Sequence, residues 1–506
     1  MGMPSGHDPL TSEAQEDEDR VLLAKAYFDV NEFKRAAHTL RGTRSQCGRF
    51  LRWYSLFLAG ERRKNEEAQE ENGTGGPPTV SKSRVCNQLL PQLQAELQAE
   101  ADSKRLDSFA HYMQALVLRE LQQPEKATQA LLQAVSGFPC LWAAWTTLAA
   151  LNPNEEDVAK LQLPNHWVCD FFRAHAALEA QQNSRAIELY ETLLLKWPNS
   201  AYVRSQLAIA RYNLREFDEA QAGFESLLQH DPYRLDQVDT YSNILYVKEQ
   251  KRALSSLAHT CVSIDKYRPE TCCVIGNYYS LKGAHEKAVT YFRRALKLDR
   301  DFLSAWTLMG HEYVELKNTA AAVDAYRHAV DINAKDYRAW YGLGQTYEIL
   351  QMMYYALFYY RKATSLRPYD ARMWCAMAGC YKQLAHKQEA IQCYQRAEKN
   401  DDREGIALQE LAKLFCDEGD KKQAAHYYKE MLKQRELHGE MAGQETQDAL
   451  LFLADFCKSN GEFNEAQHYC SRLLDLGGPE KEEAKALLRD IRSTQQQFSS
   501  QSASHG

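Results

Sequence analysis

Residues 304–337 read SAWTLMGHEYVELKNTAAAVDAYRHAVDINAKDY, and this arrangement of small and aromatic residues returns every 34 residues between residues 271 and 432. The copies are anchored at equivalent positions, which are Cys272, Trp306, Trp340, Trp374 and Leu408. Counted from the anchor, every copy has a small residue at +4, namely Gly276, Gly310, Gly344, Ala378 and Ala412. Every copy also has alanine at +16 and an aromatic residue at +20, namely Phe292, Tyr326, Tyr360, Tyr394 and Tyr428. The chain therefore contains an internal repeat.

Each repeated position has a physical role in a pair of helices. Offsets 0, +3, +4 and +7 lie on one face of a first helix, and +16, +20 and +23 lie on one face of a second. The small residues allow the two helices to approach closely, and each aromatic side chain fills the space beside that contact by burying ~150–250 Å². A period of 34 residues with this signature is typical of the tetratricopeptide repeat. We therefore predict an all-α fold, a superhelical solenoid of about 12–13 helix pairs.

The regularity of the repeat divides the chain into segments. Between residues 170 and 441 the 34-residue copies follow one another without insertion, and the copies on either side are less regular. We predict a disordered acidic N-terminus at 1–19, N-terminal repeat units at 20–60, a flexible inserted loop at 61–84, irregular units at 85–169, the regular array at 170–441, a last repeat with a capping helix at 442–492, and a disordered tail at 493–506.

Composition limits the functional classes. A net charge of −7 argues against a general nucleic-acid surface. The N-terminus lacks the apolar region of a secretory signal, and no apolar stretch is long enough to span a membrane. Thirteen cysteines are scattered without the paired spacing of a zinc site, so we expect them to be free thiols in the core. The sequence predicts an intracellular, soluble protein.

Catalytic motifs are incomplete wherever they begin. His311 and Glu312 could open a zinc-binding H-E-x-x-H motif, but position 315 is glutamate. Gly342 and Gly344 could open a dinucleotide-binding loop, but tyrosine replaces the third glycine. The repeats leave no room for a separate catalytic domain. We therefore predict that the protein is not an enzyme and has no cofactor or metal site.

A solenoid offers a curved groove lined by its first helices. Residues outside the packed stripe stand at offsets −2, +1, +5, +8 and +9. They are Glu270, Cys273, Asn277, Ser280 and Leu281 in one copy, Ser304, Thr307, His311, Val314 and Glu315 in the next, and Arg338, Tyr341, Gln345, Glu348 and Ile349 in the third. This mixed polar set with carboxylates suits a short extended peptide that carries a basic residue and apolar neighbours. The alternative is that these residues only solvate an exposed helix face.

Several segments resemble one family beyond the repeat template. These segments are DKYRPETCCVIGNYYSL at 265–281, AWTLMGHEY at 305–313, YRAWYGLGQTYEIL at 337–350, LAKAYFDV at 23–30, RAAH at 35–38 and DPYR at 231–234. They are similar to the eighth subunit of the anaphase-promoting complex (cyclosome), and the resemblance extends from about residue 19 to 476.

The resemblance implies a non-catalytic scaffold in a multisubunit ubiquitin ligase that acts on mitotic regulators in the nucleus and cytoplasm. Family members bind other subunits of the complex, including further repeat subunits, and pair as homodimers through their N-terminal repeats. Their C-terminal groove receives the short basic C-box of activating coactivators. By similarity, Asn277 and Glu312 are the first candidates for binding this peptide, with His311, Arg338, Gln345 and Glu348 beside them.

Two other functions are compatible with helical repeats. A chaperone adaptor binds acidic tails of heat-shock proteins and needs Lys and Arg converging in the groove. Here the corresponding positions hold Cys273, Asn277, Thr307 and His311. A repeat-bearing transferase would need a large α/β domain after the repeats, where this chain has none.

Overall fold

The computed structural model describes residues 9–73, 87–103, 106–152, 158, 160–400, 402, 405–438, 443–476, 482–491 and 493. Every regular element in these ranges is a helix, which confirms the predicted all-α repeat fold. The chain forms two compact units, residues 1–233 and 234–506, which we call the N-terminal and C-terminal units and describe separately.

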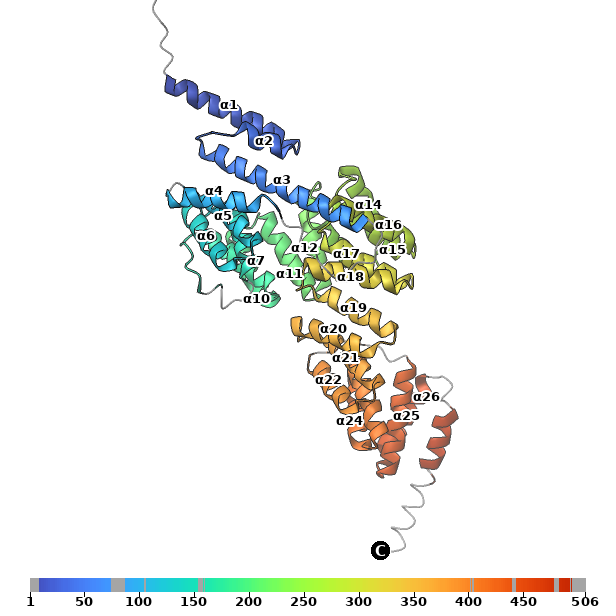
Figure 1. Ribbon diagram of the computed structural model, residues 1–506. Coiled ribbons are helices and arrows are strands. Elements are labelled where there is room, and N and C mark those ends of the chain that lie inside the picture. The colour runs from blue at the N-terminus through green and yellow to red at the C-terminus, as the bar shows by residue number, and fades with distance from the viewer. Residues whose placement is uncertain are drawn as a thin grey trace, which may run out of the picture. The chain divides into compact units, whose positions relative to one another are not determined.

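The N-terminal unit packs its helices one against the next in chain order (Figure 1). Its helices are α1 (Pro9–Asp29), α2 (Phe33–Thr39), α3 (Gln46–Gly73), α4 (Leu90–Asp102), α5 (Ser108–Glu120), α6 (Pro124–Gly137), α7 (Trp142–Leu151), α9 (Val168–Glu179), α10 (Asn183–Lys196), α11 (Ala201–Asn213) and α12 (Phe217–His230).

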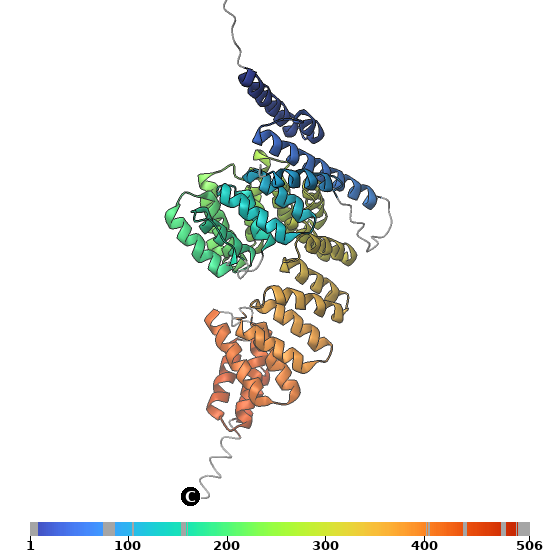
Figure 2. The same ribbon diagram turned by 60° about the vertical axis from the view of Figure 1, so that its left-hand side comes forward.

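The C-terminal unit is built of helix pairs, and from α15 to α26 each helix packs against the next (Figure 2). Its helices are α13 (Val238–Val247), α14 (Lys251–Ile264), α15 (Pro269–Leu281), α16 (His285–Leu298), α17 (Leu303–Glu315), α18 (Thr319–Ile332), α19 (Tyr337–Ile349), α20 (Met353–Leu366), α21 (Ala371–Gln383), α22 (Lys387–Lys399), α23 (Ile406–Glu418), α24 (Lys421–His438), α25 (Gln444–Ser459) and α26 (Phe463–Leu476). Residues 482–491 are also helical.

The small residue at +4 and the aromatic residue at +20 touch within each of the three copies whose small residue is glycine. A Cβ added to Gly310 would stand 2.5 Å from the Tyr326 ring, and one added to Gly342 of the next copy would also stand 2.5 Å from it. Tyr326 is fully buried between these two glycines. The ring of α18 thus packs against α17 of its own copy and α19 of the next, which joins neighbouring copies into one core.

Polar contacts between copies recur at the repeat spacing. An arginine at +21 donates from Nη2 to the hydroxyl of the tyrosine at +7 of the following copy, over 2.7 Å for Arg293 and Tyr313 and 3.0 Å for Arg327 and Tyr347. The anchor tryptophan has a similar role. Trp340 Nε1 donates to a carbonyl six residues earlier, over 2.8 Å, and so holds the end of the preceding copy.

The turn inside each helix pair uses one left-handed residue, and these residues are spaced by 34. They are Gln181, Arg215, Glu249, Gly283, Lys317, Gln351, Ala385 and Gly419, with φ between 52° and 83°. The following amide closes the turn; for example, Asn318 N–H donates to the Tyr313 carbonyl over 2.8 Å. Where the residue is not glycine, the left-handed backbone costs ~1–2 kcal/mol. The closure of the helix pair therefore offsets a local strain.

Two predicted boundaries differ from the structure. Helix α1 includes residues 9–19, where the sequence predicted disorder, because this acidic segment contains three glutamates together with Leu10, Ala14 and Gln15, all of which are strong helix formers. Helix α3 continues through residues 61–73, where the sequence predicted a loop. Ion pairs from Arg62 to Glu66 (3.0 Å) and Arg63 to Glu67 (2.8 Å) support that extension at the i, i+4 spacing. The rest of the predicted loop (74–84), residues 1–8 and residues 494–506 lie outside the described residues.

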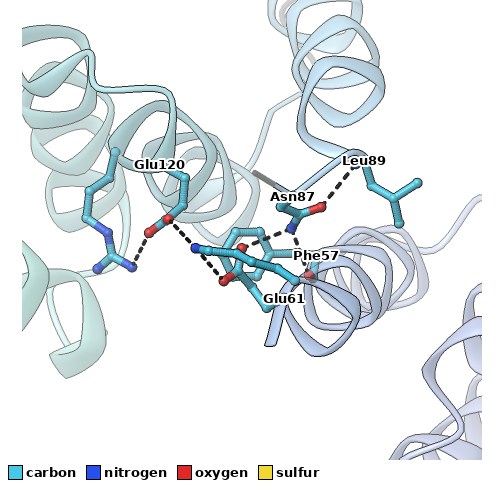
Figure 3. A network of polar contacts seen from close by, with 7 residues as sticks. Phe57, Glu61, Asn87, Leu89 and Glu120 are labelled. Carbon is cyan, nitrogen blue, oxygen red and sulfur yellow. Dashed lines mark hydrogen bonds and ion pairs between the residues drawn. The ribbon is translucent and has the colours of Figure 1, made fainter. Parts of the chain in front are cut away.

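A polar network holds the chain on both sides of residues 74–86. Asn87 Nδ2 donates to the Phe57 carbonyl (3.2 Å) and to Glu61 Oε1 (3.0 Å), and Asn87 Oδ1 accepts from the Leu89 amide (Figure 3). Lys64 lies between the carboxylates of Glu61 (3.1 Å) and Glu120 (3.6 Å). These contacts tie α3 to the start of α4 and to α5.

We expect Gly310→Ala to destabilise the C-terminal unit relative to Gly379→Ala. The first substitution overpacks the buried Tyr326 ring, whereas a Cβ at Gly379 meets nothing within 4 Å. Both substitutions gain the higher helix propensity of alanine, about 1 kcal/mol, so the difference isolates the overpacking, about 1–3 kcal/mol. Urea unfolding followed by circular dichroism measures it. Equal stabilisation by both substitutions would contradict the proposed packing.

Candidate peptide-binding groove

The first helices of consecutive copies contact one another directly. Helix α15 packs against α13 and α17, and α17 also packs against α19. This is the arrangement expected on the inner side of a superhelix, where the first helices are crowded. The predicted groove residues lie on these helices.

Asn277, the first candidate, is buried between α15 and α13. Only 1% of the residue is exposed. Its Nδ2 donates to Ser242 Oγ over 2.8 Å and to Asn243 Oδ1 over 2.7 Å. Both donor hydrogens of the amide thus bind the preceding copy, so this residue joins two copies of the repeat.

Glu312, the second candidate, is 4% exposed and joins three helices. Its Oε1 accepts from Ser280 Oγ of α15 over 2.6 Å, and its Oε2 lies 2.8 Å from Nδ1 of His285 at the start of α16. A buried carboxylate is stable only when it is paired in this way. Both first candidates therefore belong to one polar layer between the first helices.

Three other candidates meet in a hollow of about 420 Å³. His311, Gln345 and Glu348 line it together with Val314, Glu315, Tyr326, Ile349, Gln351 and Gln383. The lining combines two carboxylates with apolar side chains from α17 and α19. These are the features that a basic residue with an apolar neighbour needs.

Hydrogen bonds from the second helices orient the polar side chains of the hollow. Tyr326 Oη lies 2.8 Å from His311 Nδ1, and Tyr360 donates to Glu348 Oε2 over 2.7 Å. Neighbouring protein removes water from part of the His311 ring and lowers its pKa to about 4, although the side chain is open to the hollow, and the positive charge of Arg338 adds to the effect. His311 is therefore neutral at pH 7 and does not repel a basic ligand.

Arg338, the remaining candidate, is bound to its own turn. Its Nε donates to Asp336 Oδ1 over 3.1 Å. Burial raises the pKa of Asp239, and the positive charge of Arg338 opposes that shift. Asp239 accepts from Ser304 Oγ over 2.8 Å, although 65 residues separate the two. Copies that are not adjacent in sequence thus meet along the inner side.

The offset rule for groove residues is correct in part. Cys273 and Thr307, both at +1, were predicted to face the groove, but they are 0% and 4% exposed. The prediction is wrong there because neighbouring first helices cover that side. At +5, Asn277 is covered in the same way, whereas His311 and Gln345 are exposed. The rule also omitted Tyr326, which lines the hollow. Its position at +20 predicts a packed ring but does not predict that its hydroxyl group reaches His311.

Within the described ranges, one group of side chains has the spacing of metal ligands. The ligand atoms of Cys457, Glu462 and Glu465 lie within 4.8 Å of one another, with the cysteine buried and both glutamates exposed. Glu465 is already paired with Lys429 over 3.3 Å. Because exposed carboxylates often cluster without an ion, this group does not by itself indicate a metal centre.

Comparison with known proteins identifies the family. The family model of anaphase promoting complex subunit 8 / Cdc23 matches residues 4–208, and that of the cilia and flagella-associated protein 70 C-terminal domain matches residues 225–489. Anaphase-promoting complex subunit 8 of Arabidopsis thaliana is 52% identical over 508 residues, covering 100% of this chain and 87% of the relative. The chain belongs to the anaphase-promoting complex subunit 8 family.

Other members of the subunit 8 family align at similar coverage. The Dictyostelium discoideum subunit 8 is 47% identical and covers 94% of this chain and 87% of its own length. The CDC23 subunit of Saccharomyces cerevisiae is 36% identical and covers 94% and 86%. These alignments span both regions matched by family models, so the second match reflects repeats of the same kind.

A solved structure shows the same fold. The crystal structure of the APC/C hetero-tetramer Cut9-Hcn1 aligns with a TM-score of 0.60, at 17% identity, over 94% of this chain and 90% of that chain. The likeness confirms the repeat architecture predicted from the 34-residue period. In the part of the chain that the structure describes, no helix is long and apolar enough to cross a membrane.

We expect Asn277→Ala to destabilise the C-terminal unit by about 1–3 kcal/mol, because it leaves the Ser242 and Asn243 acceptors unpaired between two helices. The matched substitution Gln345→Ala, at an exposed position of the same groove, should change stability by no more than about 0.5 kcal/mol. Chemical denaturation of both variants measures the difference. Similar stability of the two variants would contradict a structural role for Asn277.

Proposed function

We propose that this chain is a non-catalytic scaffold subunit of the anaphase-promoting complex, an E3 ubiquitin ligase, working in the nucleus and cytoplasm. In this role it binds other subunits of the complex, including further repeat subunits, and receives the C-box of coactivators in its groove. Support for the scaffold role comes from the family and from the repeat fold. The hollow between α17 and α19 carries the proposal of peptide binding.

The chemistry of the hollow fits a basic peptide. Glu315 and Glu348 can pair with a guanidinium group, and Val314 and Ile349 can contact an adjacent apolar side chain. No lysine or arginine is among the residues described as lining it. A chaperone adaptor needs cations there to bind a terminal carboxylate, so the hollow favours the C-box over the alternative.

The buried candidates require a different kind of test from the exposed ones. Alanine at Asn277 or Glu312 would disturb the packing of α15 and α17, so a loss of binding by such variants would not distinguish ligand contact from structural damage. Glu315 and Glu348 line the hollow and remain accessible. Isosteric Glu→Gln changes at these positions remove charge and preserve shape.

We expect the double variant Glu315→Gln, Glu348→Gln to bind a synthetic C-box peptide at least about tenfold more weakly, because each lost charge-assisted hydrogen bond contributes about 1.5–3 kcal/mol. Fluorescence anisotropy with a labelled peptide measures the Kd. Glu389→Gln, on the exposed side of α22, makes the same type of charge change and should have no effect. If the double variant folds and binds as tightly as the original chain, the peptide does not occupy this hollow.

We also propose that the chain forms a homodimer through its N-terminal repeats. Leu22 is 66% exposed, Leu23 48% and Val30 68%, and all three lie on α1 or directly after it. Leu22 and Val30 are separated by eight residues, which places them on one side of the helix with Leu23 beside them. An exposed apolar stripe of this kind supports a contact with a second copy.

We expect Leu22→Glu, Val30→Glu to convert the dimer into a monomer, because each charge would have to be buried in the contact. Light scattering coupled to size-exclusion chromatography measures the mass. Lys126→Glu alters the charge of an exposed residue on α6, outside this apolar stripe, and should leave the mass unchanged. A monomeric original chain at micromolar concentration would contradict the proposal.

A further inference from the structure

Helix α20 carries three exposed aromatic residues. Tyr354 is 72% exposed, Tyr355 56% and Phe358 54%. Tyr354 and Phe358 are four residues apart, and Tyr355 and Phe358 are three apart, so the three side chains are neighbours on the helix surface. We call these three residues the α20 aromatic face.

The repeat template does not require aromatic residues at these positions. The equivalent residues are Glu286, Lys287 and Thr290 in α16, Ala320, Ala321 and Asp324 in α18, and Gln388, Glu389 and Gln392 in α22. Copies on both sides thus place small or polar residues where α20 places three rings. Packing within the solenoid leaves more than half of each of these side chains exposed, so it does not fully account for the difference.

The exposed area is large for a solvated helix. Aromatic side chains bury ~150–250 Å² each when covered, so three that are more than half exposed offer about 350 Å². This is comparable to the largest apolar patch on a typical monomer, which is often functional. Ring contacts also restrain the face: Tyr355 stacks on Tyr347 at 5.6 Å, and Phe358 meets Tyr359 at 5.2 Å. Restrained rings lose little conformational entropy on binding.

The charges on α20 indicate the chemistry of a partner. The helix contains no aspartate or glutamate, and its charged residues are Arg361 and Lys362, one turn beyond the aromatic face. Both side chains are exposed. Arg361 also donates to Tyr381 Oη over 2.6 Å, which fixes its position. A ligand that covers the rings and continues along the helix would therefore meet positive charge.

We propose that the α20 aromatic face binds a segment of another polypeptide in which apolar side chains stand beside carboxylates. The apolar side chains cover the rings, and the carboxylates pair with Lys362 and Arg361. This surface is separate from the hollow proposed for the C-box, whose described lining includes none of the three aromatic residues. The inference is thus independent of the peptide-binding proposal.

The decisive experiment replaces the face with the residues of the next copy. The variant Tyr354→Gln, Tyr355→Glu, Phe358→Gln gives α20 the equivalent side chains of α22 and should keep its thermal midpoint within about 2 °C, because the positions are exposed. The probe is an array of overlapping 15-residue peptides from proteins that co-purify with the full-length chain. Peptides that bind are then measured in solution by anisotropy.

We expect the bound peptides to carry Asp or Glu beside apolar residues and to bind the triple variant at least tenfold more weakly. Lys362→Glu should weaken binding several-fold, and added salt should weaken binding to the original chain. Gln388→Ala, Gln392→Ala on α22 is the matched control and should bind normally.

Three results would overturn the inference. The first is that no peptide depends on the triple substitution. The second is that the dependent peptides are basic. The third is that the triple substitution alters the mass of the purified chain, which would make a second copy the occupant.

Discussion

The contact between a small residue on one helix and an aromatic ring on the next is the constraint on which this structure depends. Tyr326 lies against Gly310 of its own copy and Gly342 of the following one, in places where a single added carbon would stand 2.5 Å from the ring. One buried side chain therefore sets the spacing of three helices. Since no copy can bury its apolar face alone, this shared ring makes the stack cooperative from neighbour to neighbour.

The close approach of the helices also decides which polar residues a ligand can reach. It brings the first helices into direct contact, and Asn277 and Glu312 become part of the scaffold through hydrogen bonds to Ser242, Asn243 and Ser280. Further along the array, His311, Gln345 and Glu348 line an open hollow instead. The same repeat position is thus structural in one copy and available for recognition in the next.

The repeat pattern was sufficient to predict the helices, the small–aromatic contacts and six of the nine residues described as lining the hollow, because each depends on residues within one or two copies. It could not predict the burial of Asn277 or Thr307, which depends on how strongly the superhelix curves. The hydrogen bond from Ser304 to Asp239, which are 65 residues apart, forms because this curvature brings non-adjacent copies into contact. The residues of a single copy do not determine the curvature. Composition also failed at residues 61–73, where charged side chains that are typical of loops pair along a helix.

The left-handed residues of the turns, from Gln181 to Gly419, keep a spacing of 34 without interruption. The role of each residue therefore depends on its distance in sequence from the turn of its copy. One residue inserted into a helix would rotate every later side chain of that helix by about 100°, moving a groove position onto the core face. An insertion in a turn would leave the rotation unchanged. Insertions and deletions in this protein are consequently tolerable only where one helix ends and the next begins. The length of each helix is fixed because its residues must face the core on one side and the groove or the solvent on the other.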